Sequence, residues 1–176
     1  MKRIYGFTAM MVVAAAAKAA DIYMTAADVN GPTTSFNGAG KWSNGLPPDP
    51  TNTYRTAYQM RTPDNTTGIA YTFAAPQLTI NAGGSLLLKS SGALTITNLV
   101  LNGGSIGHGL DNYTGKFFGG ITVSSASSIT ANENNPRSFM FYSTISGAGN
   151  LTIAMSQTNS LKQTSFWPTT AGIPEN

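Results

Sequence analysis

Short apolar triplets in an alternating pattern recur between about Tyr71 and Ile153. In each triplet the first and third residues are apolar, while the middle one is most often Thr. Successive side chains of a β-strand point to opposite sides, so the ends of each triplet should face a core and the middle residue should usually face water. The triplets are Leu78–Ile80, Leu86–Leu88, Leu94–Ile96, Leu99–Leu101, Ile121–Val123 and Leu151–Ile153. The pattern predicts strands of about three to five residues.

Two of these segments repeat one another. After one deletion, of Ala82, Leu78–Leu86 and Leu99–Ile106 share the order apolar-x-apolar-Asn, a glycine pair, Ser, apolar. The starts of the segments at Leu78, Leu99 and Ile121 are 21 and 22 residues apart. A fixed period of this size is typical of a solenoid, and Asn-Gly-Gly supplies the positive φ angles of a corner. An antiparallel sandwich or barrel would also show short strands and turns, but the repeated Asn-Gly-Gly-Ser favours an all-β solenoid with coils of about 21–22 residues.

The beginning of the chain reads as a secretion signal. Met1–Arg3 is charged, Ile4–Ala17 is mostly apolar, and Ala17–Ala19 has the small-x-small pattern of a cleavage site. An amphipathic helix retained in the mature protein is the alternative, but Met10–Ala17 has no polar face. The apolar run is too short for a membrane anchor, which needs roughly 20 such residues. We therefore expect a signal peptide over residues 1–19 and an exported protein.

The rest of the chain divides into three segments of different composition and pattern. Residues 20–70 are rich in proline and predict an irregular N-terminal cap, with Trp42 more plausibly plugging that cap than holding a ligand. Residues 71–155 carry the solenoid repeats. The pattern fades after Met155, and residues 156–176 form a tail that either folds over the last coil or, as we expect, marks a truncated piece of a longer repeat protein.

Three segments point to a family. They are Gly40–Pro48, the two Asn-Gly-Gly-Ser segments, and Ile145–Ile153 with its Ser-Gly-x-Gly-Asn-Leu-Thr-Ile order. Together they resemble bacterial autotransporter-associated β-strand repeat proteins. The resemblance implies a passenger-type surface protein with a right-handed parallel β-helix, in which the repeat assists secretion and folding. It implies no particular active site.

Charge and cysteine content narrow the function classes. The chain has ten basic and seven acidic residues, but three of the basic ones, Lys2, Arg3 and Lys18, lie in the expected leader. The mature protein would thus carry seven of each sign, with the cations scattered singly, which argues against a nucleic-acid partner. The absence of cysteine excludes disulfides and thiolate metal sites.

No constellation of residues predicts catalysis. The only histidine, His108, lies in a glycine-rich stretch that we interpret as a solvent-exposed turn rather than a metal site. A glycosidase needs a pair of placed carboxylates; only Asp111 and Glu133, one coil apart, could meet, and Arg137 would neutralise them. No Gly-x-Ser-x-Gly elbow accompanies the histidine. We expect no catalytic residue, no cofactor and no metal.

Aromatic residues leave one binding hypothesis open. Trp42, Tyr54 and Tyr58 could stack against sugar rings, although packing within the cap is the simpler interpretation, and Phe139 and Phe141 are expected in the core. The sequence therefore predicts a secreted or surface-displayed structural or adhesive solenoid, extracellular or at the bacterial cell surface, with surface glycans or another surface protein as partner. The alternative is a carbohydrate-binding module or a β-helical protein that acts on polysaccharides.

Overall fold

The computed structural model describes residues 19–64, 67–108, 114–131, 138–155 and 161–163. The described residues form β-strands and turns and contain no helix long and apolar enough to cross a membrane. The strands are β1 (Asp21–Tyr23), β2 (Thr53–Thr56), β3 (Gln59–Arg61), β4 (Tyr71–Thr72), β5 (Leu78–Asn81), β6 (Ser85–Leu88), β7 (Ala93–Asn102), β8 (Ser105–His108), β9 (Thr114–Ser125), β10 (Ser127–Ala131), β11 (Ser138–Ser146), β12 (Leu151–Met155) and β13 (Leu161–Gln163).

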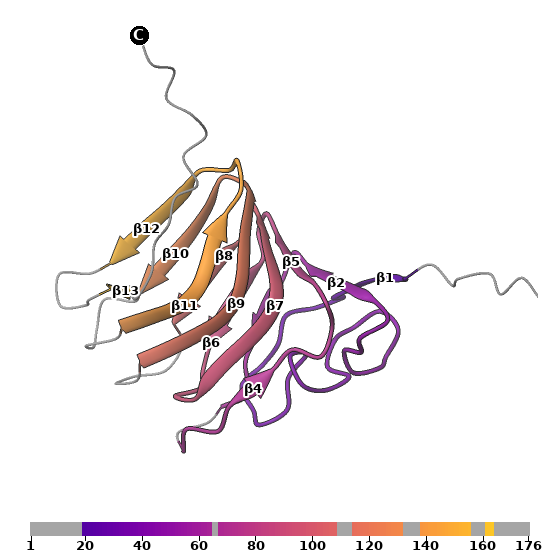
Figure 1. Ribbon diagram of the computed structural model, residues 1–176. Coiled ribbons are helices and arrows are strands. Elements are labelled where there is room, and N and C mark those ends of the chain that lie inside the picture. Colours follow the sequence, from indigo (N-terminus) through magenta and orange to yellow (C-terminus); the bar gives the residue numbers. More distant parts are fainter. Residues whose placement is uncertain (1–18, 65–66, 109–113, 132–137, 156–160, 164–176) are drawn as a thin grey trace, which may run out of the picture.

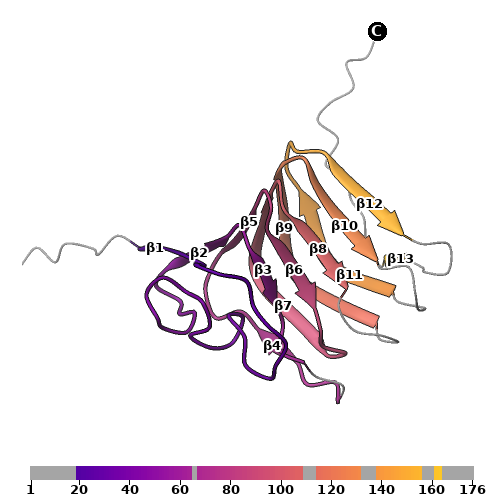
Figure 2. The ribbon, with the colours of Figure 1, turned by 180° about the vertical axis from the view of Figure 1, so that it is seen from behind.

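The strands lie in two sheets between which the chain alternates (Figures 1 and 2). The first sheet has the order β1-β2-β5-β7-β9-β11-β13, with β4 also paired to β7, and the second has the order β12-β10-β8-β6-β3. Each strand pairs in parallel with the equivalent strand of the next coil. The protein is thus an all-β parallel solenoid of about four turns, as the repeat predicted.

The strand register reproduces the sequence period. Leu78 lies opposite Leu99, and Leu99 lies opposite Ile121, which confirms the offsets of 21 and 22 residues. The end residues of the first five predicted triplets are buried between the sheets, whereas Leu151 is only partly buried. Leu151–Ile153 forms a strand, but Ile153 is 38% exposed, because β12 is the last strand of its sheet.

Glycine shapes the corner between the two sheets. Gly83 and Gly103 have φ angles of 81° and 84°, in the left-handed region that the Asn-Gly-Gly pattern predicted. The following glycine allows a close approach between coils: a Cβ atom on Gly104 would lie 2.3 Å from Cγ2 of Ile80 and 2.7 Å from its carbonyl oxygen. The corner therefore requires the first glycine of each pair for its positive φ angle and the second for the close approach between coils.

The N-terminal region is more regular than a simple cap. β2 pairs with β5 and β3 pairs with β6, so the solenoid begins near Thr53 rather than at Tyr71. The loops of residues 24–52 do cover its first coil, and Trp42 plugs this end by packing against Tyr54 and Phe73. At the other end β13 continues the first sheet beyond Met155. The remainder of the tail and residues 1–18, within the segment where we expect a signal peptide, lie outside the described residues.

The free edge of β3 is covered by one buried carboxylate. The backbone N–H of Asp28 donates to the carbonyl of Gln59 at 2.9 Å, and Oδ2 of Asp28 accepts from the backbone N–H of Arg61 at 3.0 Å. The hydroxyl of Thr34 then donates to the carbonyl of Arg61 at 2.6 Å. Asp28 itself is held by the N–H and hydroxyl of Ser35. Side chains of the cap thus take the place of a neighbouring strand, as the need to cover an open sheet edge demands.

Candidate functional site

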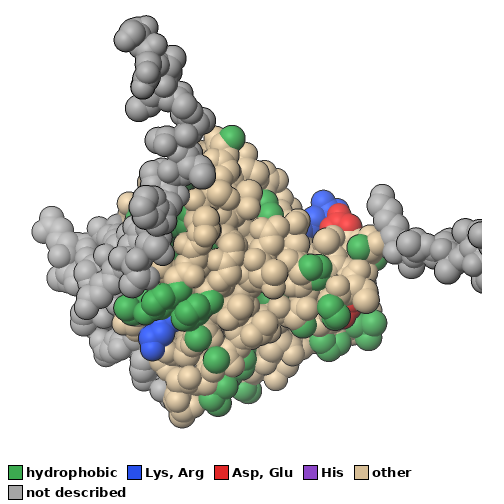
Figure 3. Space-filling model, viewed as in Figure 1, with side chains coloured by type: hydrophobic (Ala, Val, Ile, Leu, Met, Phe, Trp, Pro, Cys, Tyr) green, Lys and Arg blue, Asp and Glu red, His purple; other side chains and the backbone are tan. Residues whose placement is uncertain are grey.

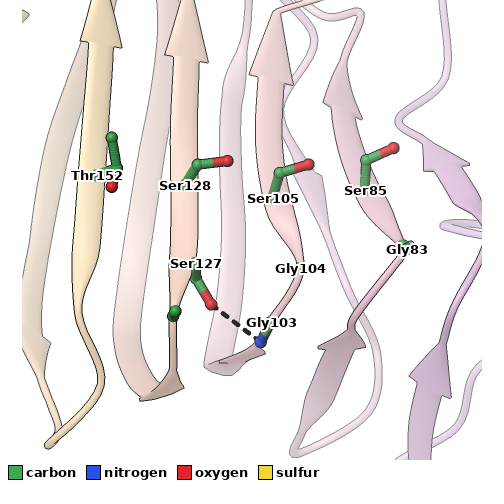
Figure 4. Close-up of a pocket in the computed structure, with 10 residues that line it drawn as sticks. Gly83, Ser85, Gly103, Gly104, Ser105, Ser127, Ser128 and Thr152 are labelled. Atoms are coloured by element: carbon green, nitrogen blue, oxygen red, sulfur yellow. Dashed lines mark hydrogen bonds between the residues drawn. The ribbon is translucent and has the colours of Figure 1, made fainter.

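The second sheet carries a row of hydroxyl groups on its outer face. Ser85 lies opposite Ser105, Ser105 opposite Ser128, and Ser128 opposite Thr152, so four successive coils each contribute one hydroxyl-bearing side chain at the same height. Figure 4 shows these side chains in line across adjacent strands. Strand pairing sets their spacing along the solenoid at about 4.8 Å.

The hydroxyl row borders an open groove of about 550 Å³. Its floor is the corner where the chain passes from the first sheet to the second; there Gly83 is exposed and Gly103 partly exposed, while Gly84 and Gly104 are buried. The hydroxyl of Ser127 accepts from the backbone N–H of Gly103 at 3.1 Å and donates to the carbonyl of Ser125 at 2.9 Å, so it is already engaged within the protein. The lining residues are Gly83, Gly84, Ser85, Gly103, Gly104, Ser105, Ala126, Ser127, Ser128 and Thr152.

The groove is suited to contact rather than to chemistry. Its lining carries no ionisable side chain, so it offers neither a general acid or base nor a charge to stabilise a transition state. A hydroxyl group both donates and accepts hydrogen bonds, and it can therefore adapt to many polar partners. The face seen in Figure 3 is likewise mostly uncharged, with small hydrophobic patches. An extended polar partner lying along the axis would meet one hydroxyl per coil.

Two of the three predicted glycan-stacking residues are buried, so this part of the hypothesis is corrected. Trp42 is only 4% exposed, and its indole N–H donates to the carbonyl of Ser35 at 2.6 Å. Tyr54 is 1% exposed and packs edge-on against Trp42, with ring centroids 4.8 Å apart. Tyr58 is 44% exposed. The three rings therefore do not form one exposed face, because the first two fill the core of the cap.

The hydroxyl of Tyr54 belongs to a polar network at the surface of the cap. It donates to Oδ2 of Asp49 at 2.9 Å, and the same carboxylate accepts from the hydroxyl of Thr51 and the amide of Asn52. These hydrogen bonds, led by that from Thr51, hold the pKa of Asp49 well below its usual range. Burial and the bond to Asp49 raise the pKa of Tyr54. The network fixes a loop and shows no sign of a reactive group.

His108 does not lie in an exposed turn, which corrects the prediction from sequence. It is the last residue of β8, is 4% exposed, and packs edge-on against Phe139 with ring centroids 5.4 Å apart. The alternation of β8 points Ile106 and His108 inward together. Among the described residues, no three acidic, histidine or cysteine side chains gather as metal ligands. Asp111, Glu133 and Arg137 lie outside the described residues.

Sequence reasoning missed two surface features. The hydroxyl row was overlooked because serine after a glycine pair was interpreted only as part of a turn, although its repetition at Ser85 and Ser105 was the available signal. A second feature is an aromatic pair on the outer face of the first sheet, where the rings of Phe118 and Tyr142 stack at 4.6 Å with an interplanar angle of 7°. Each ring covers one face of the other, so we interpret the pair as a packing contact between neighbouring strands rather than as a surface for stacking a ligand.

Comparison with known proteins found no match: no family model matches the chain, and no curated protein and no solved structure is significantly similar to it. The function must therefore be argued from the chain itself.

Proposed function

We propose that this protein is an exported structural or adhesive β-solenoid, without catalysis of its own, that holds a surface partner along the groove of the second sheet. The observation that carries the proposal is the row of Ser85, Ser105, Ser128 and Thr152 beside a glycine floor. An active site gathers different ionisable groups at one point, whereas this face repeats one neutral group across four coils. Repetition favours many weak contacts with an extended partner.

The cellular setting follows from the sequence. The charged start, apolar stretch and small-x-small site predict export, and the repeats resemble those of autotransporter-associated proteins, whose solenoids are displayed at the bacterial surface. A solenoid without cysteine also needs no oxidising partner to fold after translocation. We therefore place the function outside the cell or at the cell surface, with a glycan or another surface protein as partner.

The test blocks the groove without disturbing the core. Ser105 and Ser128 point outward, and no hydrogen bond of either side chain is seen within the described part of the chain. Arginine at these positions would fill the groove while removing no internal bond. Thr97→Arg, at an exposed position of β7 in the first sheet, adds the same side chain elsewhere and is the matched control. Circular dichroism should show the same β spectrum for all three proteins.

The measurement is the attachment of beads coated with each protein to layers of bacterial and epithelial cells. We expect Ser105→Arg with Ser128→Arg to lower attachment by about tenfold or more, equivalent to roughly 1.4 kcal/mol or more, with Thr97→Arg close to wild type. Equal loss in both variants, or no attachment by the wild type, would contradict the proposal. Release of unsaturated products from pectin or alginate would contradict its non-catalytic part.

A further inference from the structure

A second, smaller cavity lies where β1 and β2 meet the first corner of the solenoid. It measures about 230 Å³, opens to solvent, and lies apart from the groove of the second sheet, with which it shares no lining residue. Its walls are Tyr23, Met24, Arg55, Thr56, Ala57 and Asn81. Three of these, one aromatic, one cationic and one amide side chain, differ in chemistry, unlike the uniform hydroxyls of the groove.

The amide of Asn81 ends a directional ladder of hydrogen bonds. The hydroxyl of Ser125 donates to Oδ1 of Asn102 at 3.1 Å, and Nδ2 of Asn102 donates to Oδ1 of Asn81 at 3.0 Å. Each amide in this ladder turns its nitrogen toward the preceding coil. Nδ2 of Asn81 must therefore face the first coil, and within the described ranges it donates to no protein acceptor.

The first coil has no amide with which to continue the ladder. Thr56 lies opposite Ile80, so the next residue, Ala57, takes the position equivalent to Asn81. The methyl group of Ala57 is too short to fill the space that an asparagine would occupy. The cavity is therefore the gap left by the missing rung, and a hydrogen-bond donor points into it.

Two of the other walls, Arg55 and Tyr23, add a second donor and an aromatic face. The Nε atom of Arg55 lies 3.0 Å from Oδ2 of Asp21, and its guanidinium carbon lies 6.0 Å from the centre of the Tyr23 ring. In the described part of the chain the two terminal nitrogens of Arg55 make no further hydrogen bond. Tyr23 is 50% exposed, so its ring can still receive a ligand.

We propose that this cavity binds one neutral pyranose unit of a glycan. Hydroxyl oxygens of the sugar would accept from Asn81 and Arg55, and the C–H face of the ring would pack on Tyr23. A neutral sugar is favoured over a uronate because Asp21 already balances the charge of Arg55. The site is independent of the groove, so either can fail without the other.

The test uses the full chain with four small probes and saturation-transfer NMR titrations. The probes are methyl β-D-glucopyranoside, methyl β-D-galactopyranoside, methyl α-D-mannopyranoside and sodium glucuronate. At least one neutral glycoside should bind with a Kd on the order of millimolar, as expected for a small open cavity. Binding of none, or of glucuronate more tightly than of every neutral probe, would overturn the proposal.

Two variants locate the site. Tyr23→Ala should weaken binding about tenfold or more through loss of the stacking face. Ala57→Asn should abolish it by filling the gap with the missing amide, while raising Tm because the ladder gains a rung. Loss of binding with higher stability cannot arise from unfolding. Tyr58→Ala, which removes an exposed aromatic ring outside the cavity, is the control and should bind as wild type. Unchanged binding by Ala57→Asn would overturn the assignment.

Discussion

The most informative stability test concerns the carboxylate that covers the edge of β3. In Asp28→Ala the cap keeps its backbone bond to Gln59, but the N–H groups of Arg61 and Ser35 lose their acceptor. The hydroxyl of Ser35 also loses its 2.6 Å bond to the carboxylate, although it still accepts from the N–H of Lys41. The variant thus leaves two buried backbone N–H groups without a hydrogen-bond acceptor.

The expected cost follows from these two groups. A buried donor left without an acceptor costs about 1–3 kcal/mol, so the two together should lower the free energy of unfolding by roughly 2–6 kcal/mol. In a chain of this size 1 kcal/mol shifts Tm by about 2–4 °C, which predicts a fall in Tm on the order of 10 °C. The uncovered edge should also increase aggregation on heating.

The matched control is Asp21→Ala. Asp21 is likewise an acidic residue with a partner, but that partner is the Arg55 side chain at 3.0 Å, and the Asp21 side chain is 56% exposed. Removal of an exposed pair costs about 1 kcal/mol or less. Urea unfolding followed by circular dichroism measures both variants. A cost for Asp28→Ala no larger than that for Asp21→Ala would refute the idea that the carboxylate stands in for a strand.

Two further predictions concern other parts of the molecule. Gly104→Ala should destabilise the protein by about 2–4 kcal/mol, because the new methyl group would overlap the side chain and carbonyl of buried Ile80. The control is Gly120→Ala, whose new methyl group would have its nearest neighbour at 3.4 Å. It should cost about 1 kcal/mol or less in the same urea titration. Asp49→Asn should lower Tm at pH 7. Because the pKa of Asp49 is lowered in the folded protein, its carboxylate stabilises the fold above the unfolded pKa of 3.8, and this stabilisation is lost in acid. The difference in Tm between the variant and the wild type should therefore shrink as the pH falls below about 4 toward the folded pKa. A difference in Tm that stayed constant down to pH 2 would contradict the role given to the hydrogen bond from Thr51.

The fold was predictable because each coil repeats a short local pattern of apolar residues and glycines. Leu78, Leu99 and Ile121 each begin an inward-facing pair, and the positive φ of Gly83 and Gly103 follows from the Asn-Gly-Gly order. In a solenoid each coil contacts only its neighbours, so a period in the sequence translates directly into a register in space. This is why the 21- and 22-residue offsets were sufficient.

The site was less predictable because it depends on contacts that the period does not encode. Trp42 and Tyr54 are buried only because the loops of the cap fold back over the first coil. His108 faces the core because β8 extends through it, although its glycine neighbours predicted a turn. The gap at Ala57 becomes visible only once the strand pairing aligns it with Asn81.

The uniform parallel stacking makes this molecule adjustable in length. Each coil after the first adds one strand to each sheet, one hydroxyl to the outer row and about 4.8 Å to the axis, while the covered edge at β3 is unaffected. Duplication or deletion of a whole unit of 21 or 22 residues would therefore preserve every other register. Evolution, or a protein engineer, could tune the reach of such a chain in discrete steps by gene duplication alone.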